Sequence, residues 1–141
     1  MKKKTGFTLV ELVVVVLIIA LLAAVAAPRF LNTAAKANDS AARHSLTVIR
    51  DAIELFTAEN GAEPTAPATE LLEYLRDTSF PECPVGDFAN PAGIEIVGTP
   101  GDLTATPNSD DAWKYSTESG NFIINSADES VLNAGEFYHN W

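Results

Sequence analysis

Few side chains in this sequence have the types and spacing that chemistry needs. The two histidines, His44 and His139, lie far apart in the chain, and Cys83 is the single cysteine. The sequence contains no phosphate-binding glycine loop, no Gly-x-Ser-x-Gly motif and no His-Glu-x-x-His motif. One cysteine permits neither an intramolecular disulfide nor a zinc site built from cysteines. We therefore expect no catalytic residue, and we expect Cys83 to be a buried thiol.

Glu11 has the strongest claim to a chemical role. It precedes a run in which every residue from Leu12 to Ala27 is Leu, Val, Ile or Ala. As a helix, the stretch from Phe7 to Ala27 would span about 31 Å, close to the thickness of the bilayer hydrocarbon. An ionised side chain in such a helix costs a few kcal/mol unless it reaches the interface or a partner. Glu11 is therefore expected either to reach the lipid headgroups or to form one half of an ion pair.

The residues leave three interpretations of the N-terminal segment open. The small residues Ala24 to Ala26 suit the cleavage of an ordinary secretory signal, although Glu11 and the length of the apolar run argue against one. A plain membrane anchor explains the length, and the basic residues Lys2 to Lys4 would keep its N-terminus in the cytoplasm. In the third interpretation, a short basic leader is removed from a helix that is retained.

The third interpretation corresponds to a known type of signal. The sequence Lys2-Lys3-Lys4-Thr5-Gly6 followed by Phe7-Thr8-Leu9-Val10-Glu11-Leu12 resembles the class III signal of type IV pilins and pseudopilins. The resemblance implies that a prepilin peptidase cuts between Gly6 and Phe7 and then methylates the amine of Phe7. It also implies that Glu11 pairs with this amine during subunit assembly. Pro28, which ends the apolar run, is expected to bend the helix or melt one turn of it, as a helix break.

An amphipathic helix is expected to follow the apolar run. Leu46, Ile49, Ile53 and Phe56 recur at spacings of three and four residues, and the pair Asn60-Gly61 is a helix stop signal. The predicted organisation is a cleaved leader (residues 1–6), a transmembrane and filament-core helix (7–28), an amphipathic helix (29–60) and a globular head (61–141).

The head is predicted to contain a loop, a short helix near Leu71 to Leu75, and a small antiparallel sheet. Apolar residues alternate in three short segments, which are Ile94–Val97, Trp113–Ser116 and Asn121–Asn125. Their aromatic residues are expected to pack as a core against the long helix. The fold class is therefore α+β, and the order of the elements resembles the pilin fold.

The charge of the chain restricts its partners. The formal net charge is −10, and after Pro28 only six basic residues face eighteen acidic ones. Such a surface repels nucleic acid, so no nucleic-acid partner is expected. The late acids Asp102, Asp110, Asp111 and Asp128, with Glu129 nearby, supply oxygen ligands of the kind that calcium prefers, although their spacing is not that of an EF-hand. Some pseudopilins bind calcium in such loops, and no other cofactor is expected.

The resemblance implies a structural subunit of a bacterial filament and not an enzyme. Many type IV pilins tie down a late loop with a disulfide, so the single cysteine favours a pseudopilin of a type II secretion system over a pilin for adhesion, motility or DNA uptake. The chain would wait in the inner membrane, with its N-terminus in the cytoplasm and its head in the periplasm, before it joins an extracytoplasmic filament. The implied partners are further copies of the chain, other pilins or pseudopilins, prepilin peptidase, the assembly platform with its ATPase, and membrane lipid. A membrane-tethered binding module that never polymerises is the alternative from another class, and an uncut Gly6 would favour it.

Overall fold

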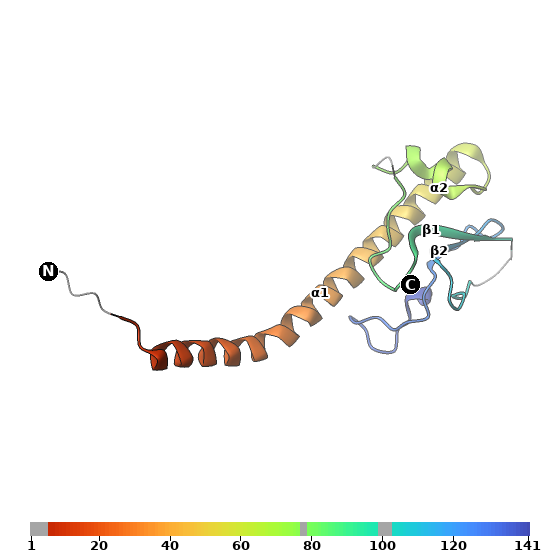
Figure 1. The fold of residues 1–141 in the computed structure, drawn as a ribbon. Coiled ribbons are helices and arrows are strands. Elements are labelled where there is room, and N and C mark those ends of the chain that lie inside the picture. Colours follow the sequence, from red (N-terminus) through yellow and green to blue (C-terminus); the bar gives the residue numbers. More distant parts are fainter. Residues whose placement is uncertain (1–5, 77–78, 99–102) are drawn as a thin grey trace. The chain divides into compact units, whose positions relative to one another are not determined.

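A long helix and a small sheet make up most of the regular structure of this chain. A computed structural model describes residues 6–76, 79–98 and 103–141, apart from the side chains of Leu31 and Asn32. Helix α1 (Leu9–Asn60) is followed by short helices and three strands (Figure 1). The chain divides into two compact units, residues 1–35 and residues 36–141, and α1 contributes to both.

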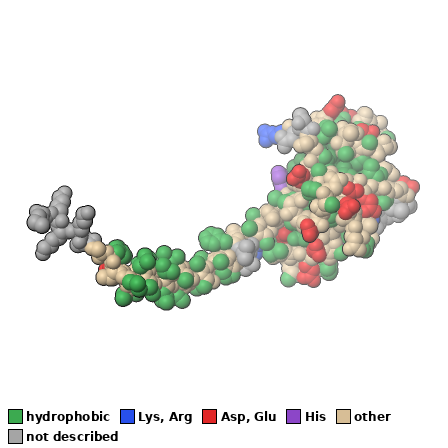
Figure 2. All heavy atoms as spheres, viewed as in Figure 1, with side chains coloured by type: hydrophobic (Ala, Val, Ile, Leu, Met, Phe, Trp, Pro, Cys, Tyr) green, Lys and Arg blue, Asp and Glu red, His purple; other side chains and the backbone are tan. Residues whose placement is uncertain are grey.

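In the first unit, α1 is apolar on every side and has no protein cover. Its large apolar side chains from Phe7 to Val25 are between 47% and 80% exposed, and they form an almost unbroken apolar surface (Figure 2). Among the described residues, α1 is the one helix long and apolar enough to cross a membrane. A helix that is apolar on all sides is typical of a membrane span, since a surface helix of a soluble protein keeps one polar face.

In the second unit, α1 becomes amphipathic, as its sequence period predicts. Ala42, Leu46, Ile49, Ala52 and Ile53 are buried on one face, while the other residues between Ala42 and Ile53 are partly or fully exposed. The helix ends at Asn60, where Gly61 takes a φ of 71° and donates its N–H to the Thr57 carbonyl at 2.8 Å. Glycine adopts this left-handed conformation without a steric penalty, so the predicted helix stop is confirmed.

The sheet contains β1 (Asn90–Val97), β2 (Asp111–Ser116) and β3 (Phe122–Ile124), in that spatial order. Strands β2 and β3 pair antiparallel, with Trp113 opposite Ile124 and Tyr115 opposite Phe122. All four side chains are almost completely buried. The predicted antiparallel pairing of these two segments and the packing of their aromatic residues in the core are therefore confirmed.

The pairing of β1 corrects one part of the sequence prediction. β1 runs parallel to β2, with Ile94 opposite Trp113 and Ile96 opposite Tyr115, so the sheet is mixed and not wholly antiparallel. Parallel neighbours need a crossover connection of a dozen or more residues, and residues 98–110 are long enough to supply it. The alternation in Ile94–Val97 predicts a strand, but the same alternation suits either direction.

Short helices complete the second unit. The predicted short helix consists of α2 (Pro67–Glu70) and the 3₁₀ turn η1 (Leu71–Glu73), and a second 3₁₀ turn, η2 (Tyr138–Asn140), lies near residue 141. Proline suits the first turn of a helix because the N–H that it lacks would have no partner there. Leu71 and Leu75 point inward and are buried, whereas Leu72 is partly exposed.

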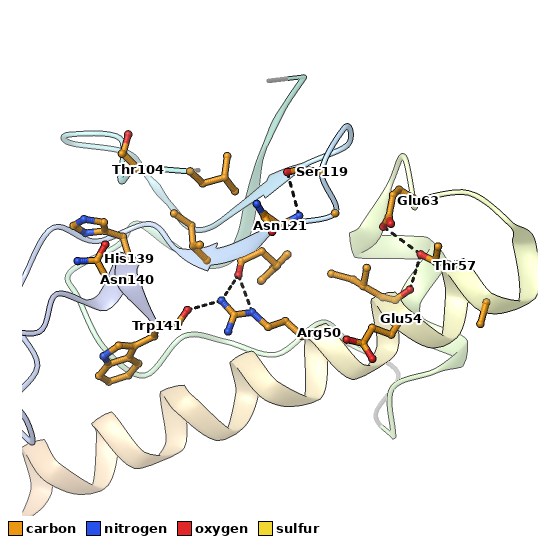
Figure 3. Close-up of a pocket in the computed structure, with 16 residues that line it drawn as sticks. Arg50, Glu54, Thr57, Glu63, Thr104, Ser119, Asn121, His139, Asn140 and Trp141 are labelled. Atoms are coloured by element: carbon orange, nitrogen blue, oxygen red, sulfur yellow. Dashed lines mark hydrogen bonds between the residues drawn. The ribbon is translucent and has the colours of Figure 1, made fainter. Parts of the chain in front are cut away.

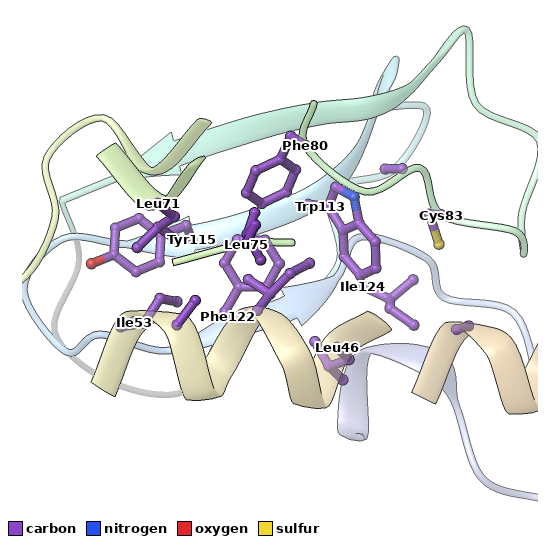
Figure 4. Close-up of a cluster of buried hydrophobic side chains, with 14 of the residues drawn as sticks. Leu46, Ile53, Leu71, Leu75, Phe80, Cys83, Trp113, Tyr115, Phe122 and Ile124 are labelled. Carbon is purple, nitrogen blue, oxygen red and sulfur yellow. The ribbon is translucent and has the colours of Figure 1, made fainter. Parts of the chain in front are cut away.

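Phe122 lies at the centre of the core. Its ring centroid is 5.5 Å from that of Trp113, 6.0 Å from that of Tyr115 and 6.1 Å from that of Phe80. Leu46 and Ile53 of α1 lie on the other side of this aromatic cluster (Figure 4). The strands, the loop before β1 and α1 therefore share one core, and Phe122 is in contact with most of its aromatic side chains.

Replacing Phe122 with alanine should lower the free energy of unfolding by about 3–5 kcal/mol, because it leaves a cavity inside a closely packed aromatic cluster. Urea unfolding of the full chain in detergent, followed by tryptophan fluorescence, measures this loss. Leu55→Ala is the matched control, because Leu55 is 54% exposed on α1 and its truncation should change the same quantity by less than about 0.5 kcal/mol. Equal losses in the two variants would contradict the central place of Phe122.

Candidate functional site

The first turn of α1 places Glu11 in a reciprocal cap with Thr8. The Thr8 backbone N–H and hydroxyl both donate to Glu11 Oε2, at 2.8 and 2.7 Å, and the Glu11 N–H donates to Thr8 Oγ1 at 3.2 Å. This is a capping box, which satisfies N–H groups that have no partner within the helix. The cap also explains why α1 begins at Leu9, two residues after Phe7. Both side-chain contacts use Oε2, so Oε1 has no partner among the described residues.

Gly6 and Phe7 lie outside the helix and are open to solvent. Phe7 is 80% exposed, and a Cβ placed on Gly6 would meet no atom within 4 Å. The fold of the chain therefore does not require glycine at this position. A peptidase could reach the bond between the two residues, but cleavage there and N-methylation of Phe7 stay predictions, as does the assembly role of Glu11.

Pro28 does not interrupt α1 in this structure. The helix includes Pro28 and continues to Asn60, so the expected melted turn is absent from the described helix. A proline inside a helix removes one hydrogen bond, and the alanine and leucine residues near it favour the helical state. A helix break at Pro28 within an assembled filament stays a prediction.

The second unit contains a buried carboxylate that the sequence analysis missed. Asp39 on α1 is 1% exposed. It accepts hydrogen bonds from Ser130 Oγ at 2.8 Å, the Leu132 N–H at 2.9 Å and Tyr138 Oη at 2.6 Å. Asp39 thereby ties residues 128–138, which we call the latch loop, to α1. Its spacing of three from Ala42 and seven from Leu46 places it on the apolar face of the helix, and this was the signal that could have identified it.

The bonds that Asp39 accepts keep it ionised despite its burial. Burial alone would raise its pKa, but the hydrogen bonds from Tyr138, Leu132 and Ser130 outweigh this effect, so the pKa lies below its usual value. A second tie lies close by, where Arg43 Nη2 contacts Glu136 Oε2 at 2.7 Å and the Arg43 guanidinium stacks 3.8 Å from the ring centroid of Trp141. The latch loop is thus held to α1 by one buried carboxylate and one partly exposed ion pair.

A cleft of about 990 Å³ lies between α1, β3 and the segment 139–141. Arg50 lies in it and donates to the Phe122 carbonyl at 2.8 Å and to the Trp141 carbonyl at 2.5 Å (Figure 3). His139 Nδ1 lies 3.1 Å from the Ser126 carbonyl, and Glu63 accepts a bond from Thr57 at 3.2 Å. These polar side chains are engaged in holding the fold, and the cleft joins no nucleophile to a base among the described residues.

The predicted calcium ligands do not converge in the described part of the chain. Asp111 accepts a bond from Asn90 at 2.9 Å and Asp128 one from Ser126 at 3.0 Å, whereas Asp110 is exposed. Asp102 lies outside the described residues, and within them no group of three or more His, Cys, Asp or Glu side chains is placed to hold a metal ion. Calcium binding therefore stays a prediction.

A network around Glu95 occupies the region near the crossover. Glu95 accepts bonds from Thr106 Oγ1 at 2.8 Å and Asn125 Nδ2 at 2.9 Å, and Lys114 Nζ lies 3.4 Å from its Oε1. Burial acts to raise the pKa of Glu95, but these hydrogen bonds and the positive charge of Lys114 lower it overall. The ammonium group of Lys114, in the same chain, thus lies beside the carboxylate of Glu95.

The remaining candidates for chemistry are Cys83 and the two histidines. Cys83 is buried, as predicted, and burial raises its pKa to about 11, which leaves an unreactive thiol at neutral pH. His44 is exposed on α1, far in sequence from the partly exposed His139.

Comparisons with known proteins begin with the N-terminus. Residues 1–27 match the family model of the prokaryotic N-terminal methylation motif. The chain is 35% identical over 65 residues to type II secretion system core protein G of Vibrio cholerae, an alignment that covers 46% of this chain and 44% of the relative. The chain therefore spans less than half the length of that relative.

Two further relatives are matched over most of their length. Type II secretion system core protein G of Pseudomonas aeruginosa is 28% identical over 112 residues, which is 71% of this chain and 79% of the relative. Prepilin peptidase-dependent protein D of Escherichia coli is 32% identical over 110 residues, which is 72% of this chain and 75% of the relative. Other relatives have the names fimbrial protein, in Pseudomonas aeruginosa, and type IV narrow pilus major component, in Thermus thermophilus. No solved structure matches the chain.

Replacing Asp39 with asparagine should lower the free energy of unfolding by about 1–3 kcal/mol at neutral pH, because buried donors lose a charged acceptor. The pKa of Asp39 is lower in the folded chain than in the unfolded chain. Its contribution is therefore complete above the unfolded-state pKa and is lost as the pH falls through the folded-state pKa. The difference between wild type and Asp39→Asn should shrink below about pH 4.

Urea unfolding of both full chains in detergent, at neutral pH and at about pH 3, measures this difference. The control is Asp51→Asn, which removes an exposed acid from α1 and should change the free energy of unfolding by less than about 0.5 kcal/mol at either pH. An effect of Asp39→Asn that stays constant with pH would show that the charge is not what holds the latch loop.

Proposed function

The chain belongs to the family of type IV pilins and pseudopilins, and we propose that it is a pseudopilin of a type II secretion system, processed by prepilin peptidase and assembled through α1. The observation that carries this proposal is the first part of α1. Its apolar side chains lack protein cover, and a carboxylate is fixed at the helix start with one oxygen open. Such a helix needs lipid before assembly and needs neighbouring subunits after it.

In the proposed pathway, the precursor enters the inner membrane with Lys2 to Lys4 in the cytoplasm and the head in the periplasm. Prepilin peptidase removes residues 1–6 and methylates Phe7. An assembly platform and its ATPase then extract the subunit into the filament. Because lipid tails are as apolar as leucine, the helices gain little hydrophobic energy by leaving the membrane. Side-chain packing and polar pairing must therefore select the correct position.

Glu11 is suited to provide that polar pairing. Thr8 holds Glu11 Oε2, so the carboxylate stays at the start of the helix, while Oε1 remains available to a further donor. Cleavage after Gly6 would create a positive amine at Phe7. An ion pair between this amine and Glu11 of a neighbouring subunit gains strength in a low-dielectric bundle, where each charge alone would be costly.

A pilin for adhesion, motility or DNA uptake is the second candidate, because fimbrial and pilus proteins are among the relatives. Deletion of the gene separates the two functions. Loss of exported enzymes from the culture medium, with surface fimbriae intact, supports the pseudopilin, and the reverse pattern supports the pilin. As a structural subunit, the chain is proposed to have no enzymatic activity of its own. We also propose that calcium binds in the late loops, with Asp102, Asp110, Asp111 and Asp128 as the candidate ligands.

Replacing Gly6 with alanine should abolish cleavage by prepilin peptidase and leave the full precursor in the membrane. The structure has open space around Gly6, so the added methyl group should not disturb the fold, and the loss would report recognition by the peptidase. Co-expression with a prepilin peptidase, followed by intact-mass measurement and N-terminal sequencing, tests this expectation.

Gly98→Ala is the matched control, because a Cβ there first meets an atom at 4.0 Å. The control and the wild type should both begin at N-methylated Phe7. A wild-type chain that begins near Ala27 would indicate an ordinary signal peptide. A wild-type chain that stays uncut would favour the membrane-tethered module, and either result would overturn the proposal.

Replacing Glu11 with glutamine should leave cleavage intact but reduce filament yield by about tenfold or more. The amide keeps the shape of the side chain yet cannot neutralise the amine of Phe7, and tenfold corresponds to about 1.4 kcal/mol per subunit. Immunoblots of sheared filaments and of membranes measure both steps. Glu54→Gln is the control on the exposed surface of α1 and should assemble normally. Normal yield from Glu11→Gln would exclude the ion pair.

A further inference from the structure

A lysine, an asparagine and a glutamate meet on the face of the sheet that turns away from the aromatic core. Lys114 of β2 stands opposite Glu95 of β1 in the register of the sheet. Asn125 directly follows β3, and its backbone N–H donates to the Ala112 carbonyl of β2, so Asn125 is a diagonal neighbour of Lys114 on this face. The side chain of Lys114 is only 13% exposed, and Asn125 is 2% exposed. The amine and the carboxamide are thus largely removed from water.

Thr106, in the segment between β1 and β2, connects the three side chains. Its hydroxyl accepts a hydrogen bond from Lys114 Nζ at 2.7 Å and donates one to Glu95 Oε1 at 2.8 Å. Its backbone N–H donates to Asn125 Oδ1 at 2.6 Å. Asn125 Nδ2 in turn donates to Glu95 Oε2 at 2.9 Å. The lysine amine and the asparagine carboxamide therefore contact the same threonine and lie beside the same carboxylate.

This network provides a partner for each atom that takes part in an amide exchange. A lysine amine is a nucleophile once it has lost a proton, and Glu95 can take that proton directly, at 3.4 Å, or through the Thr106 hydroxyl. The Thr106 N–H points at the oxygen of the Asn125 carboxamide, where negative charge develops during attack. Glu95 also contacts Asn125 Nδ2, so it can return a proton to the nitrogen that leaves.

We propose that Lys114 and Asn125 become joined by an intramolecular isopeptide bond, with Glu95 as the catalytic base and acid. Glu95 takes a proton from Lys114 Nζ, and the neutral amine attacks Asn125 Cγ to form the new C–N bond. The bond between Cγ and Nδ2 of Asn125 then breaks. Nδ2 leaves as ammonium with the two protons that Nζ gives up, so the carboxylate is regenerated and no oxidant or cofactor is consumed.

The arrangement suits a reaction that takes place once in each chain. Holding the two groups against Thr106 makes their encounter intramolecular, and the burial of Asn125 limits competing attack by water. A slow reaction is sufficient, because the bond has to form only once. The product links β2 covalently to the segment after β3, which prevents the two from separating under tension. The bond does not depend on assembly, so its absence would leave the proposed function standing.

Intact mass of the full chain, expressed with prepilin peptidase and purified in detergent, tests the bond. After allowance for processing, wild type should be one ammonia molecule lighter than its sequence predicts. Lys114→Arg and Glu95→Gln should each keep the full mass, because the first lacks a nucleophilic amine and the second lacks the base. The matched control, Glu82→Gln, removes an exposed acid of the head and should be as light as wild type. A folded, protease-resistant wild type of full mass would overturn the proposal.

Digestion of the unfolded chain locates the bond. A protease that cuts after glutamate releases residues 96–118, which contain Lys114, and residues 119–129, which contain Asn125. The two peptides should stay joined in wild type and separate in Lys114→Arg. A ring closed within one asparagine also loses ammonia but leaves the peptides separate, and that result would overturn the proposal. Joined peptides from Glu95→Gln would exclude Glu95 as the catalytic group.

Discussion

The constraint on which the rest of this structure depends is that one helix must be stable in two solvents. The residues before Pro28 are apolar on every side of α1, whereas those after Lys36 have a single apolar face. A membrane or a bundle of neighbouring helices can cover the first part, and only the head can cover the second. The face that carries Leu46, Ile49 and Ile53 therefore decides where the hairpin and the short helices pack.

The sequence predicted the elements whose signals are local. The period of α1, its end at Asn60 and the aromatic hairpin could be read directly, because spacing and turn residues decide them. The direction of β1 could not, since alternation is the same in a parallel and an antiparallel strand. Asp39 was missed because acids are usually placed on the surface, although its spacing from Ala42 contradicted that rule. The helix continues through Pro28, where neighbouring helix formers offset the loss of one hydrogen bond, and a helix break there in an assembled filament stays a prediction.

The candidate site was also predictable only in part from the sequence. The spacing of three between Thr8 and Glu11 is a capping-box signature, and the structure turns this signature into measured bonds. Gly6 and Phe7 lie in open space, so the fold of the single chain places no demand on their identity. A role for Gly6 and Phe7 could be predicted only from the resemblance to prepilin signals, because a peptidase, and not the fold, would select these two residues.

Hydrogen bonds to two acids join segments of the second unit that are distant in sequence. Asp39 and Glu95 each join segments distant in sequence, and both have lowered pKa values because their hydrogen bonds outweigh burial. Acids engaged in this way are satisfied within the chain, so the other exposed acids account for most of the negative surface charge. At physiological salt, charges are screened beyond about 8 Å. The exposed acids therefore repel one another only over short distances, whereas the bonds of the buried Asp39 are screened much less.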